Sequence, residues 1–331
     1  MSDTIPIIDV AEFLSGRAGA LEVVARQVRE SLTTVGFFVL TGHDVSVALI
    51  EQTFGEARRF HDMPMDRKLS LKLNEHNNGY MVMGRYAVRT SDINKNTKGD
   101  LNEAFFVKRE RLSDDPLLLS GRRFVGPNVW PQESDLPGFR ANVLEYADTM
   151  DRFARRFLPA VAIALDLAPH WFDEAFEDSQ FTFRLSHYPP VVAEENQFGI
   201  APHTDSNFMT FLAQSEVPGL QVRTPADGPA GGDWVNVPHI PGSFAVNSGD
   251  MLHRWSNGRF KSTPHRALPP VGRDRYAIPF FLGPRFDQLI ECLPTCTGPG
   301  NPARWEPITY AEWQEYWYDA NYHPKHQRDV V

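Results

Sequence analysis

From residue 180 onward the chain breaks into short segments rich in Phe, Val, Leu and Thr, which Pro and Gly separate. The segments read FTFRLSHY, FMTFLAQ, GLQVRT, WVNVP, SFAVNSGDML, STPHRAL and RYAIPFFL. Aromatic and β-branched residues favour strands, and the frequent turn residues limit each strand to a few positions. Many short strands with turns between them indicate a sandwich or a barrel. We therefore expect a mainly β fold with an antiparallel core at about 180–285.

Helical periodicity lies outside this core. Apolar residues spaced three to four apart predict helices over about 21–32, 47–60 and 138–166. The apolar stripe of 138–166 is the most regular, so we expect this helix to pack on the main sheet. Residues 74–100 are polar and contain Gly, which favours an extended loop that covers a site.

The chain is expected to have four parts. They are an N-terminal region of helices and strands at 1–120, a connecting segment with the long helix at 121–179, the core at 180–285 and a helical tail at 286–331.

The composition excludes several classes of partner. The 331 residues carry a net charge of −9 and no basic run, so nucleic acid and anionic membranes are poor candidates. No apolar stretch reaches the roughly 18–20 residues of a membrane helix, and MSDTIPIIDV does not resemble a signal peptide. The two cysteines, Cys292 and Cys296, are expected to be reduced, with a disulfide or a metal pair as alternatives. We expect a monomeric cytoplasmic protein with a small-molecule substrate.

The strongest chemical signal is a possible metal site. His203 and Asp205 stand two positions apart, and side chains two apart share one face if this stretch is extended. A His-x-Asp triplet also occurs by chance, so a third ligand is required. His265 lies 60 residues beyond Asp205, with enough chain between them to fold back alongside. Two imidazoles and one carboxylate on one face of a metal suit non-haem Fe(II) that activates O2.

A cation lies at a suitable distance from this candidate triad. Arg275 follows His265 by ten residues, across the turn-like sequence PPVGRD, so a hairpin can place it on a neighbouring strand. A guanidinium can bind a carboxylate through two parallel hydrogen bonds. Arg275 is therefore a candidate for the far carboxylate of a dicarboxylate co-substrate, with an ordinary salt bridge as the alternative.

These stretches together resemble the iron- and 2-oxoglutarate-dependent dioxygenases of the isopenicillin N synthase-like group. The similar segments occur in order along nearly the whole chain: IPIIDV, GFFVLTGHDV, YPP at 188–190, HTD at 203–205, GLQV, VNSGDMLHRWSNGRFKSTPHR and RYAIPFFLGP. The resemblance implies a double-stranded β-helix, or jelly roll, with surrounding helices. It also implies Fe(II), 2-oxoglutarate as co-substrate and O2, with hydroxylation, desaturation or ring closure of a small molecule and release of succinate and CO2.

The resemblance assigns roles to individual positions. His203, Asp205 and His265 match the iron ligands, and no further catalytic side chain is implied. Arg275 matches the arginine for the distal carboxylate of 2-oxoglutarate, and Tyr188 matches a tyrosine that often bonds to the same group. Phe281 matches an aromatic position that lines the substrate cavity.

Other positions are weaker candidates for the substrate pocket. Phe208 and Phe105 are pocket candidates, with plain core positions as the alternative. Arg85, Arg89 and Arg109 lie in or beside the segment expected to cover the site. They would favour an acidic substrate unless they are simply solvated charges.

Two departures from the family pattern keep alternatives open. Ala277 stands where the family usually has Ser, two residues after the arginine, and Ser186 stands where it usually has Asn. Loss of a hydroxyl donor to a carboxylate is worth roughly 1.5–3 kcal/mol, so 2-oxoglutarate would bind more weakly unless another residue substitutes. The alternatives are a 2-oxoglutarate-independent Fe(II) oxidase and a non-enzymatic ligand-binding jelly roll.

Overall fold

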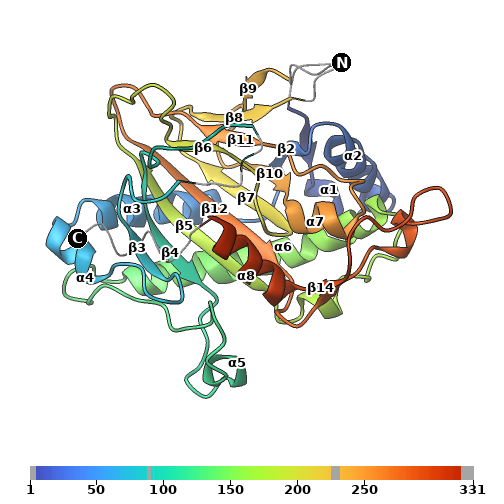
Figure 1. Cartoon of the computed structure of the whole chain (residues 1–331), viewed down its shortest axis with the longest axis horizontal. Helices are drawn as coiled ribbons and strands as arrows, with labels where there is room; N and C mark the ends of the chain where they lie inside the picture. Colours follow the sequence, from blue (N-terminus) through green and yellow to red (C-terminus); the bar gives the residue numbers. More distant parts are fainter. Residues whose placement is uncertain (1–4, 88–90, 92, 225–231, 322–331) are drawn as a thin grey trace.

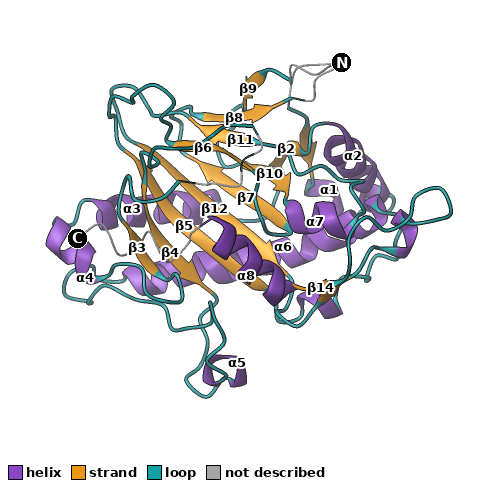
Figure 2. Ribbon diagram, viewed as in Figure 1, coloured by secondary structure: helices purple, strands orange, loops and turns teal. Residues whose placement is uncertain are grey.

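Two β-sheets form the centre of the computed structural model, which describes residues 5–87, 91, 93–224 and 232–321 (Figure 1, Figure 2). The larger sheet has the strand order β1-β2-β10-β7-β12-β5-β4-β3 and the smaller one β6-β11-β8-β9. The strands of the larger sheet are β1 Ile7–Asp9, β2 Phe37–Thr41, β3 Gly79–Met81, β4 Glu103–Lys108, β5 Gln180–Tyr188, β7 Met209–Gln214, β10 Phe244–Ser248 and β12 Arg275–Gly283. Those of the smaller sheet are β6 Ile200–His203, β8 Leu220–Arg223, β9 Trp234–Asn236 and β11 His265–Ala267.

The two sheets pack against each other. One apolar cluster joins Tyr188 and Ala277 of the larger sheet to Ala267 of the smaller one. A second cluster joins Phe37 and Val39 to residues of β8. Apart from the parallel pair β1 and β2, the paired strands run antiparallel. The predicted mainly β fold with a jelly-roll core is therefore confirmed.

Helices cover the outer face of the larger sheet. Among them are α2 Ala20–Thr34, α3 Val47–His61 and α6 Phe139–Ala164, and the remaining helices of the described residues are α1 Ala11–Leu14, α4 Met65–Ser70, α5 Pro116–Leu119, α7 Asp250–Trp255 and α8 Tyr310–Asn321. The ring of Phe153 on α6 meets that of Phe211 on β7 at 5.8 Å, and Tyr146 meets Phe183 on β5 at 5.8 Å. The apolar stripe of 138–166 thus packs on the main sheet as predicted. Figure 1 shows α6 behind this sheet and α8 in front of it.

One segment expected to be a single strand changes structure in the middle. In SFAVNSGDML the strand β10 ends at Ser248, and α7 begins at Asp250. Gly249 lies at the helix N-cap with extended backbone, and the acidic Asp250 occupies the first turn. A carboxylate there interacts favourably with the positive end of the helix dipole, which explains the start of the helix.

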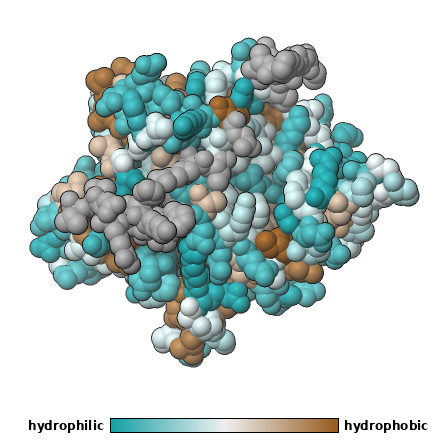
Figure 3. Space-filling model, in the orientation of Figure 1, coloured by the Kyte–Doolittle hydropathy of each residue, from teal (hydrophilic) through white to brown (hydrophobic). Residues whose placement is uncertain are grey.

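Short elements complete the chain. A small third sheet pairs β13 Leu289–Ile290 with β14 Ile308–Thr309, and 3-10 helices span Glu174–Phe176 and Pro294–Cys296. Both cysteines are free, as expected. Within the described residues, no helix combines the length and apolarity that crossing a membrane requires. The face shown in Figure 3 is mostly hydrophilic, with separate small hydrophobic areas, so the large apolar side chains lie mainly in the interior.

Strand alternation positions the site. On β12, Arg275, Ala277, Pro279 and Phe281 line one cavity between the sheets, whereas the ring of Phe280 stacks on Phe183 in the apolar core. On β5 the alternate positions 180, 182, 184, 186 and 188 line the same cavity. Because successive side chains point to opposite faces, one face of these paired strands is polar and functional and the other is core.

Candidate active site

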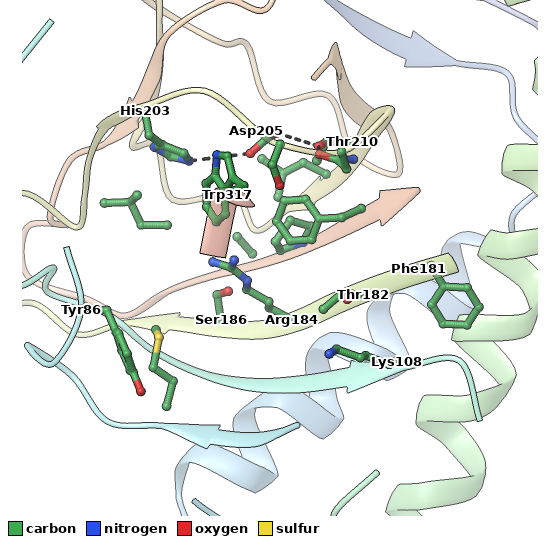
Figure 4. Close-up of a pocket in the computed structure, with 18 of the residues that line it drawn as sticks. Tyr86, Lys108, Phe181, Thr182, Arg184, Ser186, His203, Asp205, Thr210 and Trp317 are labelled. Atoms are coloured by element: carbon green, nitrogen blue, oxygen red, sulfur yellow. Dashed lines mark hydrogen bonds and ion pairs between the residues drawn. The ribbon is translucent and has the colours of Figure 1, made fainter. Parts of the chain in front are cut away.

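His203, Asp205 and His265 come together at the cavity between the two sheets. His203 ends β6 and His265 begins β11, and the two are direct cross-strand partners. Their Nε2 atoms lie 3.7 and 3.6 Å from Oδ1 of Asp205, and one donor atom of each residue lies within 4.8 Å of the others. Figure 4 shows His203 and Asp205 facing each other at this edge of the cavity.

His203 and Asp205 do not lie on one extended strand, contrary to the expectation from the sequence. β6 stops at His203, and Asp205 lies in the loop that follows, not on the same strand. The carbonyl oxygen of Asp205 accepts a hydrogen bond from the backbone N–H of Asp250 at 2.7 Å, which fixes this loop against α7. The two side chains therefore converge because the loop is fixed, not because a strand places them on one face.

Hydrogen bonds orient each of the three side chains. Nδ1 of His203 lies 2.8 Å from the carbonyl of Ala201, and Nδ1 of His265 lies 3.1 Å from that of Thr263. A carbonyl can only accept, so both Nδ1 atoms carry the proton and both Nε2 lone pairs face the centre of the triad. Oδ2 of Asp205 accepts from Thr210 at 2.6 Å and from Asn247 at 2.8 Å, which leaves Oδ1 for the same centre. Such outer hydrogen bonds are typical of metal ligands.

The charges of the triad suit a divalent cation. Burial and the neighbouring His265 lower the pKa of His203 to about 3, so its imidazole is neutral. Burial opposes the charge of Asp205, but both imidazoles and the two hydrogen bonds hold its pKa below the usual value. Two neutral imidazoles and one carboxylate are the donor set of the facial Fe(II) site, which leaves positions free for reactants. These residues fit the metal.

A second cluster, His61, Glu103 and His187, has similar spacing but different chemistry. Glu103 accepts from Nζ of Lys68 at 3.0 Å, from Nδ1 of His187 at 2.8 Å and from the hydroxyl of Tyr80. An ammonium group already compensates the carboxylate, and none of these three residues lines the cavity. This cluster is thus a buried ionic network built around Glu103, and its carboxylate is already compensated by Lys68, unlike that of Asp205.

Arg275 lies on the cavity side of β12 with unsatisfied donors. The residue is only 1% exposed, and its Nε and one terminal nitrogen have no hydrogen-bond partner among the described residues. The other terminal nitrogen donates to Gln214 at 3.4 Å, and the guanidinium lies 4.7 Å from the ring centre of Tyr188. A buried cation with free donors is costly unless a ligand supplies an anion. The arrangement fits the far carboxylate of 2-oxoglutarate.

A hydroxyl group lies beside Ala277, the position where the family usually has a serine. Ala277 is the direct cross-strand partner of Ser186, and both residues line the cavity. Directly opposed Cβ atoms lie about 4.5–5.5 Å apart, so Ser186 presents its hydroxyl next to the place where a serine at 277 would stand.

The structure corrects two of the three proposed substrate residues. Phe281 lines the cavity, but neither Phe208 nor Phe105 does, and both are fully buried. Phe105 points away because it has the opposite parity on β4 to Phe106, whose ring lies under the cavity residue Arg184. The ring of Phe208 packs against Phe172, Phe176 and Trp255.

Of the three candidate arginines of the covering segment, the two described ones, Arg85 and Arg109, make separate contacts. Arg109 lines the cavity but is paired with Asp151 at 2.9 Å. Arg85 contacts the ring of Tyr86, and Arg89 lies outside the described residues. The sequence analysis missed Arg184, which projects into the cavity from β5. The signal was available, since Arg184 has the same strand parity as Tyr188.

Known proteins resemble both halves of the chain. Residues 179–284 match the family model of the 2OG-Fe(II) oxygenase superfamily, and residues 5–133 match that of the non-haem dioxygenase in morphine synthesis N-terminal family. The 2-oxoglutarate-Fe(II) type oxidoreductase hxnY of Emericella nidulans is 34% identical over 323 residues, which cover 96% of this chain and 90% of that protein.

Solved structures that resemble this chain point to the same family. A full-length Neurospora crassa protein in complex with alpha-KG and thymine superposes with a TM-score of 0.80 and 28% identity, covering 93% of this chain and 94% of that chain. A putative 2OG-Fe(II) oxygenase family protein from Caulobacter crescentus gives a TM-score of 0.80 and 28% identity, with 95% and 98% covered. The chain therefore belongs to the 2OG-Fe(II) oxygenase superfamily, as an oxidoreductase that uses Fe(II), 2-oxoglutarate and O2.

Proposed function

We propose that His203, Asp205 and His265 hold Fe(II), that Arg275 and Tyr188 bind the distal carboxylate of 2-oxoglutarate, and that the enzyme hydroxylates a small molecule. The observation that supports this most strongly is the pairing of two features in one cavity. The three donor atoms converge with their outer hydrogen bonds made, and a buried guanidinium beside them has free donors.

Each residue has a defined task in this proposal. The Nδ1 hydrogen bonds keep both imidazoles aimed at the metal position, and Thr210 and Asn247 keep Asp205 from turning away. Arg275 and Tyr188 orient the co-substrate so that its keto-acid end faces the triad. When bound, Fe(II) and 2-oxoglutarate supply the oxidising chemistry, in which O2 is consumed and succinate and CO2 are released.

The walls of the cavity suit the apolar body of a small substrate. Apolar residues such as Phe281 and Met81 line it, which excludes water and holds an apolar substrate body. We infer hydroxylation as the outcome, and desaturation or ring closure are the alternatives that the same site supports. The free donors of Arg275 beside the triad support a dicarboxylate co-substrate, whereas a 2-oxoglutarate-independent oxidase would have to use Arg275 for its substrate instead.

We further infer a monomer that acts in the cytoplasm on a small molecule, without nucleic acid or membrane partners. The acidic net charge of −9 supports the lack of nucleic-acid and anionic membrane partners, the two free cysteines support a reducing compartment, and the monomeric state stays a prediction. The four-part division at 1–120, 121–179, 180–285 and 286–331 stays a prediction.

Succinate release tests the proposed function. The Fe(II)-loaded protein should convert 2-oxoglutarate and O2 to succinate and CO2, slowly alone and faster with a suitable small molecule. His203→Ala should lose this activity, whereas His253→Ala should retain it, because His253 bonds to the carbonyl of Phe260 and does not line the cavity. Succinate release by His203→Ala at the wild-type rate would refute the assignment.

A further inference from the structure

A second guanidinium in the cavity, that of Arg184, forms no close ion pair among the described residues, and the nearby carboxyl of Asp100 in the same cavity senses its charge without bonding to it. Arg184 projects from β5 into the cavity, and no described carboxylate lies within ion-pair distance of it. Its Nε is buried and makes no hydrogen bond among the described residues. A partly buried charge without a counter-charge is costly, and it is retained where a ligand compensates it.

Two aromatic rings fix the position of this guanidinium. Its central carbon lies 4.5 Å from the ring centre of Phe106 and 4.9 Å from that of Phe281. Cation–π contacts hold the planar group without consuming its N–H donors, which point along the plane. Figure 4 shows the side chain of Arg184 directed from β5 into the cavity, toward the side where Trp317, His203 and Asp205 are drawn.

The other described cations that line the cavity make hydrogen bonds or ion pairs, including Arg266, which has no carboxylate partner but donates to the side-chain oxygen of Gln221 at 2.9 Å. Arg109 pairs with Asp151 at 2.9 Å, and Arg111 pairs with Asp178 and with Asp115, both at 2.8 Å. Lys108 donates to the carbonyls of His76 and Phe124. Arg184 therefore differs from its charged neighbours in being available to a ligand.

Arg184 stands too far along the strand to share the co-substrate carboxylate with Arg275. Tyr188 is the cross-strand partner of Arg275, and Arg184 lies four residues before Tyr188 on the same face of β5. At roughly 3.3 Å per residue this separation is about 13 Å. The two free guanidinium groups thus serve different ends of one cavity.

We propose that Arg184 binds the primary substrate through an acidic group, so that the substrate is a small carboxylic acid with an apolar body. This proposal rests on the proposed function, because it assigns 2-oxoglutarate to Arg275 and leaves Arg184 to the substrate. The carboxylate accepts two N–H bonds from the guanidinium. The apolar body lies against Phe281, Met81 and Val82, which line the same cavity.

The test uses matched acids and amides as probes. Succinate release by the Fe(II)-loaded full chain is measured with cyclohexanecarboxylate, phenylacetate, 3-phenylpropionate and nicotinate, and with the primary amide of each. The wild type should respond to acids at lower concentration than to amides. Arg184→Gln should raise the half-saturating acid concentration about ten- to a hundredfold, the range expected for loss of charged hydrogen bonds, and remove the preference over amides. Arg184→Lys should keep part of the preference.

A matched control separates this role from general charge or folding effects. Arg123 also lies over a phenyl ring, at 4.6 Å from the centre of Phe124, but it is ion-paired with Asp319 at 2.7 Å. Arg123→Gln removes the same charge and should leave the acid response unchanged. Arg184→Gln should bind 2-oxoglutarate within about twofold of wild type in an anaerobic titration, which shows that its site is folded.

The outcomes are distinguishable. An acid response in Arg184→Gln equal to that of wild type overturns the proposal, as does a wild type that prefers the amides or responds to no acid. If the wild type neither binds 2-oxoglutarate nor releases succinate, the proposed function itself fails.

Discussion

Replacement of Arg275 by Gln should weaken 2-oxoglutarate binding strongly. The guanidinium is 1% exposed, and two of its nitrogens have no partner among the described residues until a ligand arrives. Removing one member of a buried, hydrogen-bonded charge pair costs about 2–5 kcal/mol. At about 1.4 kcal/mol per tenfold, the Kd for 2-oxoglutarate should rise about 30- to 4,000-fold.

The assay is an anaerobic titration of the Fe(II) protein with 2-oxoglutarate, followed by the visible absorption of the chelate. Arg273→Gln is the matched control, two residues earlier on the chain. Its side chain is 60% exposed and is paired with Glu216 at 2.7 Å, so its loss should change the Kd less than about threefold.

Replacement of Arg275 by the apolar Met should have a second effect, on the stability of the ligand-free protein. Without 2-oxoglutarate the buried cation is uncompensated, and burial lowers the pKa of Arg275 for that reason. Arg275→Met should therefore leave the Tm of the ligand-free protein equal or higher while it abolishes stabilisation by 2-oxoglutarate. A Kd for Arg275→Gln within threefold of wild type would refute the reasoning, because it would show that the guanidinium does not face the co-substrate.

Three further predictions follow from the contacts. Ser186→Ala removes a hydroxyl donor and should raise the Kd for 2-oxoglutarate, measured by calorimetry, about ten- to a hundredfold. Ala277→Ser in that background should restore the wild-type Kd, because residues 186 and 277 are direct cross-strand partners. A Kd that stays raised in the double variant would contradict this. Burial favours the neutral form of His187, but the carboxylates of Glu103 and Asp274 outweigh burial and raise the pKa of His187 above 6.5. The charged imidazole therefore contributes its full stabilisation below pH 6.5, and this contribution is lost as the pH rises through the raised pKa. His187→Asn should thus cost about 1.5–3 kcal/mol at pH 6 and less at pH 9 in urea unfolding, and an equal cost at both pH values would contradict this. Phe208→Ala should lower the free energy of unfolding by about 3–5 kcal/mol yet change the Kd for 2-oxoglutarate less than twofold, since Phe208 is core; a larger change in Kd would return it to the site.

Local pattern was sufficient for much of the fold. The stripe of 138–166 predicted both α6 and its packing, because apolar periodicity reports directly which face is buried. The interruption of SFAVNSGDML by α7 was not predictable in the same way. A helix of six residues has too little periodicity to detect, and only the Gly-Asp pair marks its start.

The same limit applies to the site. Residue type and order along the chain were enough to propose His203, Asp205, His265 and Arg275, since few side chains can perform that chemistry. Phe105 was wrongly expected in the cavity, because a shift of one residue along a strand moves a side chain to the opposite face. The sequence does not tell which face of β4 points to the cavity until the pairing of β4 with β5 sets the register. The strand parity of Arg184 with Tyr188 could have placed it in the cavity, but that no close ion pair holds it depends on distant residues and was not visible in the sequence.

The central claim is that the metal occupies the cluster of His203, Asp205 and His265 and not that of His61, Glu103 and His187. The most direct measurement is the visible spectrum of the anaerobic Fe(II) and 2-oxoglutarate complex in two single variants, His265→Ala and His187→Ala. The account predicts that His265→Ala loses the chelate band and that His187→Ala keeps it with a similar midpoint. A band that survives in His265→Ala and disappears in His187→Ala would contradict the account.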